Sequence, residues 1–235
     1  MKDNLSLIKK EFLKSFPEIY SKPSKVNKYL KKYSNAIEKD LRNKFLNLGL
    51  DKTFVIYANG GFGRKEIFPI SDIDISIIEK DSKKNYTKLD EFISFLWDRG
   101  YKVGHSVRSI SDIKKISKTD LKEFTSYLTR RTIVSDNEMD EKINTVLSKL
   151  WTKNNFYNAK YVEQQKRHND FYSTAYNLEP DLKESPGTLR DFQSALWILQ
   201  HCFNLSSLNE ISNSKLFYGE LNNAVNAYNL SLIHI

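Results

Sequence analysis

The sequence predicts an α+β fold in which a small sheet flanked by helices is followed by an all-helical part. The 235 residues include only 8 glycines and 5 prolines, so long apolar and charged stretches run without helix breakers. Short β-branched and aromatic runs, typical of strands, lie between residues 53 and 107. From about Asp112 onward the apolar spacing is helical, with one break at residues 178–188 that contains two prolines and a glycine.

The individual elements follow from local patterns. Apolar residues that recur every three or four positions indicate an amphipathic helix, and β-branched runs beside glycine or proline indicate strands. No convincing strand pattern follows residue 112. The expected elements are a helix over 26–49, a strand over 53–58, a strand over 71–78, a helix over 89–96 and a strand over 101–107.

This order of elements divides the chain into three predicted regions. N-terminal helices occupy residues 1–50, the α/β core occupies 51–112, and a helical domain occupies 113–235. Residues 231–235 form an apolar stretch without a cap or a polar tail, so we expect the helical domain to be truncated there.

Composition limits the class of protein. Hydrophobic residues make up 40% of the chain and aromatic residues 13%, which excludes a disordered chain. Cys202 is the only cysteine, and the first ten residues carry no signal sequence, so we expect a cytoplasmic protein without membrane contact. The net charge of +8 suits a polyanionic partner, but no basic segment is interleaved with aromatic residues, so nucleic acid is not the expected partner.

Residues 71–77 (SDIDISI) suggest a metal site. On a strand, Asp72, Asp74 and Ser76 share one face and the isoleucines share the other. The two carboxylates would lie roughly 6–7 Å apart and could bracket two divalent ions about 3.5–4 Å apart. Such oxygen ligands favour Mg²⁺. An isolated Asp-x-Asp is more often a plain exposed strand face, so the pattern needs a second signal.

The second signal lies just upstream, where Gly60 and Gly61 follow a strand. Without Cβ atoms they let backbone amides approach a phosphate, and a helix that begins there would favour negative charge. Arg64 is placed to add a bidentate contact. By itself this segment would be an ordinary turn. Pro69 bends the chain toward Asp72, which predicts that the phosphate and metal sites lie at adjacent strand ends.

These two motifs carry a resemblance to a known family. Residues 60–66 (GGFGRKE) followed by 71–74 (SDID) resemble the signature of the polymerase-beta nucleotidyltransferase superfamily. Within it the bacterial PII uridylyltransferases match best, because three further stretches resemble that family over nearly the whole chain. These stretches are 97–109, 163–180 (with Arg167 and His168) and 185–191.

The resemblance implies that Mg²⁺-bound UTP donates a uridylyl group to a tyrosine of the nitrogen-signalling protein PII, releasing pyrophosphate. Asp72 and Asp74 would be the catalytic residues and would hold the metal ions. The nucleotide-binding candidates are Gly60, Gly61, Arg64, Ser71, Arg190 and Asp191.

Some positions leave alternatives open. The superfamily usually adds a third carboxylate from a neighbouring strand, where this chain has Gly104 and His105. His105 is either a ligand, base or nucleotide contact, or a core histidine, and Arg108 either meets phosphate or forms a surface salt bridge. Thr188 could cap a helix whose first turn contains Arg190 and Asp191, and that pair is either nucleotide-facing or interdomain, or a surface pair.

The chain also departs from the family. Lys65 and Thr188 stand where glycine is common. We find no match in this sequence to the hydrolase and ligand-sensing domains of family members, and the four histidines form no His-Asp metal cluster, so uridylyl removal and sensing are not assigned. Alternative functions are another nucleotidyltransferase of the superfamily, an inactive nucleotide-binding regulatory module, or a basic nucleic-acid-binding protein.

Overall fold

A computed structural model describes residues 9–15, 17, 25–80, 86–172 and 181–205. The chain divides into two compact units, Met1–Phe16 with Asn27–Leu150, and Pro17–Val26 with Trp151–Ile235. The predicted α+β class is confirmed, and the boundaries at residues 50 and 112 stay predictions. Our expectations for the N-terminal ten residues fall mostly outside the described residues, and those for 173–180 and 231–235 fall wholly outside them.

The first unit is built on a four-stranded mixed sheet of order β3-β2-β1-β4. Strand β1 pairs antiparallel with β2 and β4, whereas β2 and β3 are parallel. Every residue of β1 is buried, because helices cover both faces of the sheet. The strands are β1 (Phe54–Ala58), β2 (Ile73–Glu79), β3 (Val103–Arg108) and β4 (Arg131–Val134).

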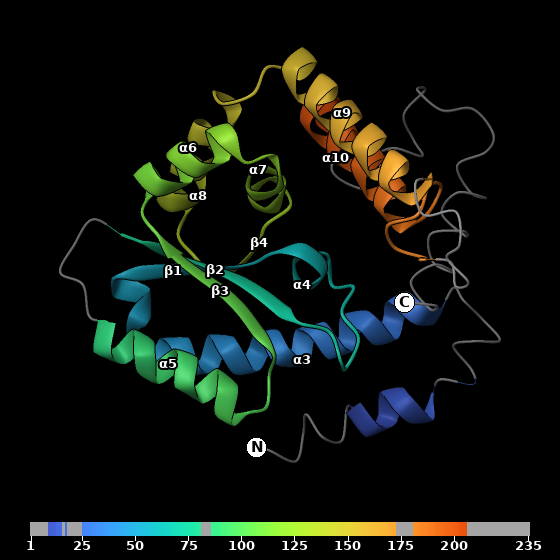
Figure 1. The fold of residues 1–235 in the computed structure, drawn as a ribbon. Helices are drawn as coiled ribbons and strands as arrows, with labels where there is room; N and C mark the ends of the chain where they lie inside the picture. Colours follow the sequence, from blue (N-terminus) through green and yellow to red (C-terminus); the bar gives the residue numbers. More distant parts are fainter. Residues whose placement is uncertain (1–8, 16, 18–24, 81–85, 173–180, 206–235) are drawn as a thin grey trace. The chain divides into compact units, whose positions relative to one another are not determined.

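Figure 1 shows α3 and α5 on one face of this sheet and α6, α7 and α8 on the other. The predicted apolar stripe of α3 is buried, with Leu30, Leu41 and Phe45 fully inaccessible to solvent. Each such side chain contributes roughly 1.5–3 kcal/mol. The helices of this unit are α3 (Val26–Asn47), the 3-10 helix η2 (Leu50–Lys52), α4 (Gly60–Arg64), α5 (Tyr86–Asp98), α6 (Ile110–Thr119), α7 (Leu121–Leu128) and α8 (Asn137–Ser148).

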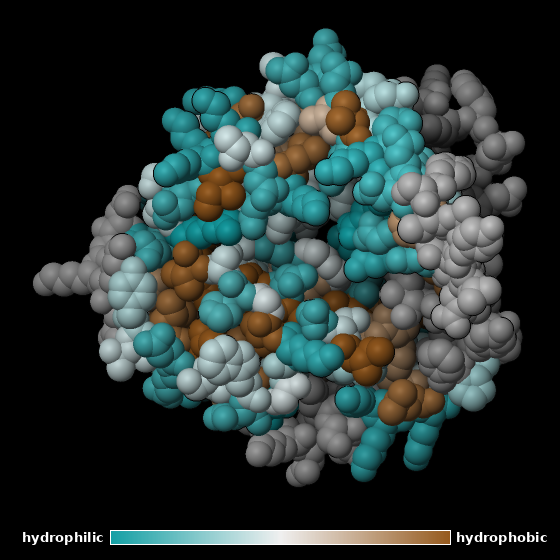
Figure 2. Space-filling view, viewed as in Figure 1, coloured by the Kyte–Doolittle hydropathy of each residue, from teal (hydrophilic) through white to brown (hydrophobic). Residues whose placement is uncertain are grey.

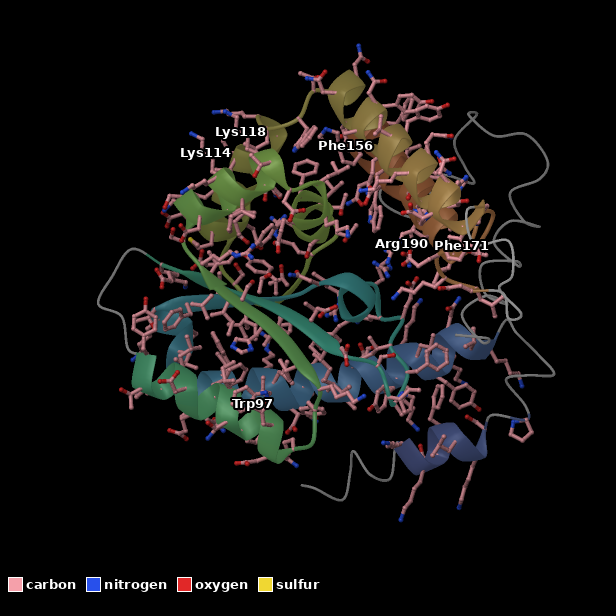
Figure 3. All side chains as sticks on the ribbon, viewed as in Figure 1. Trp97, Lys114, Lys118, Phe156, Phe171 and Arg190 are labelled. Carbon is pink, nitrogen blue, oxygen red and sulfur yellow. The ribbon has the colours of Figure 1, made fainter. Side chains whose placement is uncertain are left out.

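Polar side chains cap the N-termini of α6, α7 and α8, the helices that cover the second face of the sheet. Ser109 and Asp112 form a reciprocal capping box at α6, and Asp120 and Asp136 accept backbone N–H groups at α7 and α8. Each cap gives a partner to backbone N–H groups that the first turn of the helix cannot satisfy. The surface over α6 is mostly hydrophilic in Figure 2, as expected for a solvated helix face, and its exposed residues include Lys114 (labelled in Figure 3).

The expectation that no strand follows residue 112 is wrong, because β4 pairs with β1. Its four residues are too few to show an alternating pattern, and no glycine or proline marks its ends. Residues 131–134 form a strand because they pair with β1, which lies more than 70 residues earlier in the chain. The three predicted strands are confirmed, although β2 begins at Ile73, so that Asp72 precedes it.

The second unit contains α9 (Lys153–Tyr172) and α10 (Leu189–Phe203), which pack against each other. Lys160 is 2% exposed; its Nζ donates to Glu163 Oε2 at 2.5 Å and lies 4.3 Å from the ring centroid of Trp197. Burial lowers the pKa of this lysine. Over the described residues of both units, no helix has the length and apolarity needed to cross a bilayer.

Candidate active site

Asp74 lies between two glycines on neighbouring segments. It is paired in register with Gly104 of β3, and its backbone oxygen accepts a hydrogen bond from Asn59 N at 2.9 Å. A Cβ at Gly60 would be 2.9 Å from Asp74 Oδ2, and a Cβ at Gly104 would be 2.7 Å from Asp74 Oδ1. Both distances are shorter than a carbon atom tolerates, so the exposed carboxylate keeps its position only because both neighbours lack side chains.

The turn beside Asp74 forms where β1 ends. Asn59 is extended, and Gly60 has a φ of 52°, in the left-handed region that favours glycine. The chain then makes the single turn of α4, in which Gly63 N donates to Asn59 O at 2.7 Å and Glu66 N donates to Gly61 O at 2.8 Å. The predicted sequence of strand, glycine turn and helix is therefore present.

Asp72 and Ser71 lie on the approach to β2. Ser71 Oγ accepts a hydrogen bond from Phe68 N at 3.0 Å, which closes the turn that leads into the strand. Asp72 is exposed, and so is Asp74, whereas Ile73 between them is 2% exposed. The two predicted metal-binding carboxylates are thus both open to solvent at the start of β2.

A buried polar contact lies next to Asp74. Ser76 is 2% exposed and accepts a hydrogen bond from Asn59 Nδ2, and its hydroxyl lies 3.4 Å from Ser106 Oγ. Asn59 Oδ1 is buried and has no hydrogen-bond partner in the described part of the chain. We did not predict a role for Asn59, although its place before two glycines was the available signal. The start of α4 is thus joined to β2 by a side chain as well as by the backbone.

Arg64 lies at the end of α4, where its Nε forms an ion pair with Glu66 Oε2 at 2.7 Å. Both side chains are mostly buried, at 21% and 15% exposure. Glu66 therefore orients the guanidinium that we expect to contact phosphate.

His105 lies on the opposite face of β3 from Gly104. It is exposed and contacts the exposed Trp97 of α5 (labelled in Figure 3), with ring centroids 6.3 Å apart. Because register partners on parallel strands share a face, His105 lies on the face of Ile75 and not on that of Asp74. The core role is wrong because the side chain is exposed, and this placement favours a surface contact over metal binding.

Arg108 forms the salt bridge that was one of its two predicted roles. Its Nη1 and Nη2 donate to the two Glu123 oxygens at 2.5 and 3.1 Å, and Nη1 also donates to Tyr127 Oη at 3.3 Å. The hydrogen bonds with Glu123 raise the pKa of Arg108 above its ordinary value. This bidentate pair joins the end of β3 to α7.

Asp191 is a hydrogen-bond acceptor for several groups of the second unit. Gly187 N donates to it at 2.7 Å and Gln164 Nε2 donates at 3.0 Å. Arg167 Nη2 donates to it as well, and His168 Nε2 lies 2.9 Å from Oδ2. Burial raises the pKa of the Asp191 carboxyl, but these donors outweigh burial and the pKa lies below its ordinary value. Asp191 therefore joins α9 to the start of α10.

Arg190 (labelled in Figure 3) points to different partners. Its Nη2 pairs with Glu184 at 2.9 Å, its Nη1 donates to Gln193 at 3.0 Å, and the guanidinium carbon lies 5.7 Å from the Trp197 ring centroid. Thr188 occupies the predicted N-cap position but makes no side-chain capping bond, because its hydroxyl donates to Ser185 O at 2.5 Å. The predicted surface pair of Arg190 with Asp191 is replaced by these separate contacts.

The donor set beside Asp74 fits magnesium. Within the described residues, no group of three or more His, Cys, Asp or Glu side chains could hold a metal ion by itself. Magnesium is commonly held by one or two carboxylates together with substrate phosphates and waters. Asp72 and Asp74 are two exposed carboxylates near a glycine turn, which is the ligand type that Mg²⁺ takes.

Several known proteins are similar in sequence to this chain. A family model described as GlnD PII-uridylyltransferase matches residues 155–230. The chain is 36% identical over 184 residues to a protein of Pasteurella multocida, 40% over 173 residues to one of Vibrio vulnificus and 34% over 197 residues to one of Hydrogenovibrio crunogenus, all three named bifunctional uridylyltransferase/uridylyl-removing enzyme. The chain is a relative of the PII uridylyltransferases. The predicted resemblance is confirmed.

These alignments cover 76%, 72% and 82% of this chain, and 21%, 19% and 22% of the three relatives. The chain thus spans about a fifth of the length of the uridylyltransferases that it matches. The family model covers most of α9 and all of α10, whereas the pairwise alignments are too long to fit within the second unit and extend into the unit that holds Asp74.

Proposed function

We propose that this chain is the nucleotidyltransferase part of a PII uridylyltransferase, which transfers UMP from UTP to a tyrosine of PII and releases pyrophosphate. The observation that supports this best is the Asp74 carboxylate in the gap between Gly60 and Gly104. The similarity to uridylyltransferases is the reason for proposing UTP as the nucleotide and PII as the acceptor.

In the proposed reaction Asp72 and Asp74 would hold magnesium, which would neutralise phosphate charge and lower the barrier to attack by the tyrosine oxygen. Gly60 and Gly61 let the backbone approach the triphosphate, and Arg64, oriented by Glu66, contacts a phosphate oxygen. The tyrosine hydroxyl releases its proton to solvent and its oxygen forms a bond to the α-phosphorus, while the bond from that phosphorus to pyrophosphate breaks. Positioning and charge, rather than covalent chemistry of the protein, account for the rate.

The test is Mg²⁺-dependent release of pyrophosphate from UTP in the presence of PII. We expect Asp74→Asn to lower this rate by at least about 10²-fold, because it removes a charge where phosphate charge develops. The thermal unfolding midpoint should stay unchanged because Asp74 is exposed. Asp98→Asn, an exposed aspartate of α5, is the matched control and should keep full activity. Equal activity of the two variants would refute the assignment.

A second candidate is a nucleotide-binding module without turnover. It is favoured by one observation, since the position of β3 beside Asp74 is Gly104 and not a third carboxylate. Binding of Mg²⁺-UTP without pyrophosphate release would support this module. Comparing UTP with ATP, CTP and GTP in the same assay separates both candidates from another nucleotidyltransferase.

A further inference from the structure

Arg131, the first residue of the unpredicted strand β4, forms hydrogen bonds to the backbone of the Gly60–Gly63 turn. Its Nε donates to Gly63 O at 2.9 Å and its Nη2 donates to Phe62 O at 3.1 Å. Its third nitrogen, Nη1, donates to Glu38 Oε2 of α3. One guanidinium thus joins three segments that are far apart in sequence: α3, α4 and β4.

The contact suits arginine and no other side chain. Phe62 O and Gly63 O lie at the end of the single turn of α4, where carbonyl groups accumulate negative charge. The planar guanidinium reaches both oxygens at once and stacks over the Phe62 ring, 5.5 Å from its centroid. Lysine keeps the charge but cannot form this fork.

The turn has little room to shift. A Cβ at Gly63 would lie 2.8 Å from Ala58 O and 3.1 Å from Thr129 O, so the backbone of α4 is packed tightly between the end of β1 and the segment before β4. On its other side, Gly60 faces Asp74 Oδ2. A displacement of α4 toward or away from β4 therefore changes the gap in which the Asp74 carboxylate lies.

We infer that Arg131 is a positioning residue that sets the distance between the Gly60–Gly63 turn and Asp74, with Glu38 as its anchor. The inference rests on the proposed function for its effect on UTP, but its effect on the turn can be measured without any nucleotide. Arg131 touches neither substrate nor metal in this account and acts through the backbone of α4.

The chain offers a matched control in Arg99. It also pairs with a carboxylate of α3, with Nη2 3.2 Å from Asp40 Oδ1, and also lies over a phenylalanine, 5.1 Å from the Phe95 ring centroid. Among the described residues, Arg99 forms no hydrogen bond or ion pair with α4, because its partners lie on α3 and α5. A purely structural role predicts the same behaviour for the two arginines.

The experiment compares Arg131→Met, Arg131→Lys, Glu38→Gln and Arg99→Met in the whole chain. Amide hydrogen exchange of residues 60–66 is measured without ligand, and kcat and KM for UTP are measured with Mg²⁺ and PII. We expect Arg131→Met to speed exchange in this segment and to lower kcat/KM by about ten-fold or more, as loss of a supporting contact does. Glu38→Gln should shift both quantities in the same direction by less.

Arg131→Lys separates charge from geometry. It should recover the unfolding midpoint, because the pair with Glu38 remains, but not the exchange protection or kcat/KM. Arg99→Met should change the midpoint alone. The inference is overturned if Arg99→Met and Arg131→Met speed hydrogen exchange of residues 60–66 equally. It is also overturned if Arg131→Lys has the exchange protection and kcat/KM of the unsubstituted protein. If the unsubstituted protein turns over no UTP, the proposed function fails, and hydrogen exchange alone decides the role of Arg131.

Discussion

Two aspartates that the sequence singled out, Asp74 and Asp191, lie in opposite kinds of surroundings. Asp74 is exposed and is flanked by Gly60 and Gly104, which place hydrogen atoms where other residues would place carbon. Asp191 is mostly buried, and its oxygens accept hydrogen bonds from a backbone amide and from side chains of α9. The first carboxylate is exposed beside two glycines, whereas the second is mostly enclosed by donors of the protein itself.

The comparison shows how to distinguish a binding carboxylate from a structural one. A structural carboxylate is surrounded by donors that lower its pKa and join elements, as Asp191 joins α9 to α10. A carboxylate that binds metal and phosphate needs access and the absence of bulk around it. We therefore expect substitutions at Asp74 to change activity and substitutions at Asp191 to change stability.

Apart from the loss of activity expected for Asp74→Asn, we expect the largest effect for Asp191→Asn, on the free energy of unfolding. The variant weakens the contacts with Arg167 and His168 and leaves buried donors poorly satisfied, so the free energy of unfolding should fall by about 1–3 kcal/mol. Urea unfolding measures this change. An unchanged unfolding midpoint together with lost nucleotide binding would instead make Asp191 a ligand-binding residue.

The dependence of stability on acidic pH also tests the structural role of Asp191. The pKa of Asp191 is lowered in the folded protein, so its stabilisation is complete above the unfolded-state pKa of about 3.9 and is lost as pH falls through the lower folded-state value. Stability of the unsubstituted chain should drop over this window more than that of Asp191→Asn. Parallel profiles for the two proteins would contradict this assignment.

Gly104→Ala tests the room beside Asp74. The added Cβ would lie 2.7 Å from Asp74 Oδ1, so the carboxylate must turn away from its position. The backbone φ at Gly104 is not positive, so alanine adds no backbone strain and stability should change little. We expect kcat/KM for UTP to fall by roughly ten-fold, which corresponds to about 1.4 kcal/mol. Full activity would show that the gap is not needed.

The smallest effect concerns Lys65, which ends α4 with a φ of 61°. A residue with a Cβ in this left-handed conformation costs roughly 1 kcal/mol, which agrees with the glycine that the resemblance led us to expect at this position. Lys65→Gly should therefore stabilise the chain by up to about 1 kcal/mol, although it also loses the bond from Lys65 Nζ to Asn35 Oδ1. Lys65→Ala keeps the strained backbone, loses that bond and should not stabilise.

Local patterns were sufficient where an element and its neighbours lie close in sequence. The stripe of α3, the strand before Gly60, the turn of α4 and the strand that contains Asp74 were all predicted, because periodicity and glycine chemistry depend on adjacent residues. Local patterns failed to predict β4, because its formation depends on pairing with β1. They also left His105 and Arg108 open, because the choice depended on Trp97 and Glu123.

The sequence by itself determined that this chain has a small sheet among helices, that a glycine turn precedes an Asp-x-Asp strand, and that it is related to the PII uridylyltransferases. Only the tertiary structure decided which cation supports the turn and which donors surround Asp191. Arg131 reaches Phe62 and Glu38 across 69 and 93 positions of the chain. Contacts of that separation form when elements pack, and local periodicity does not record them.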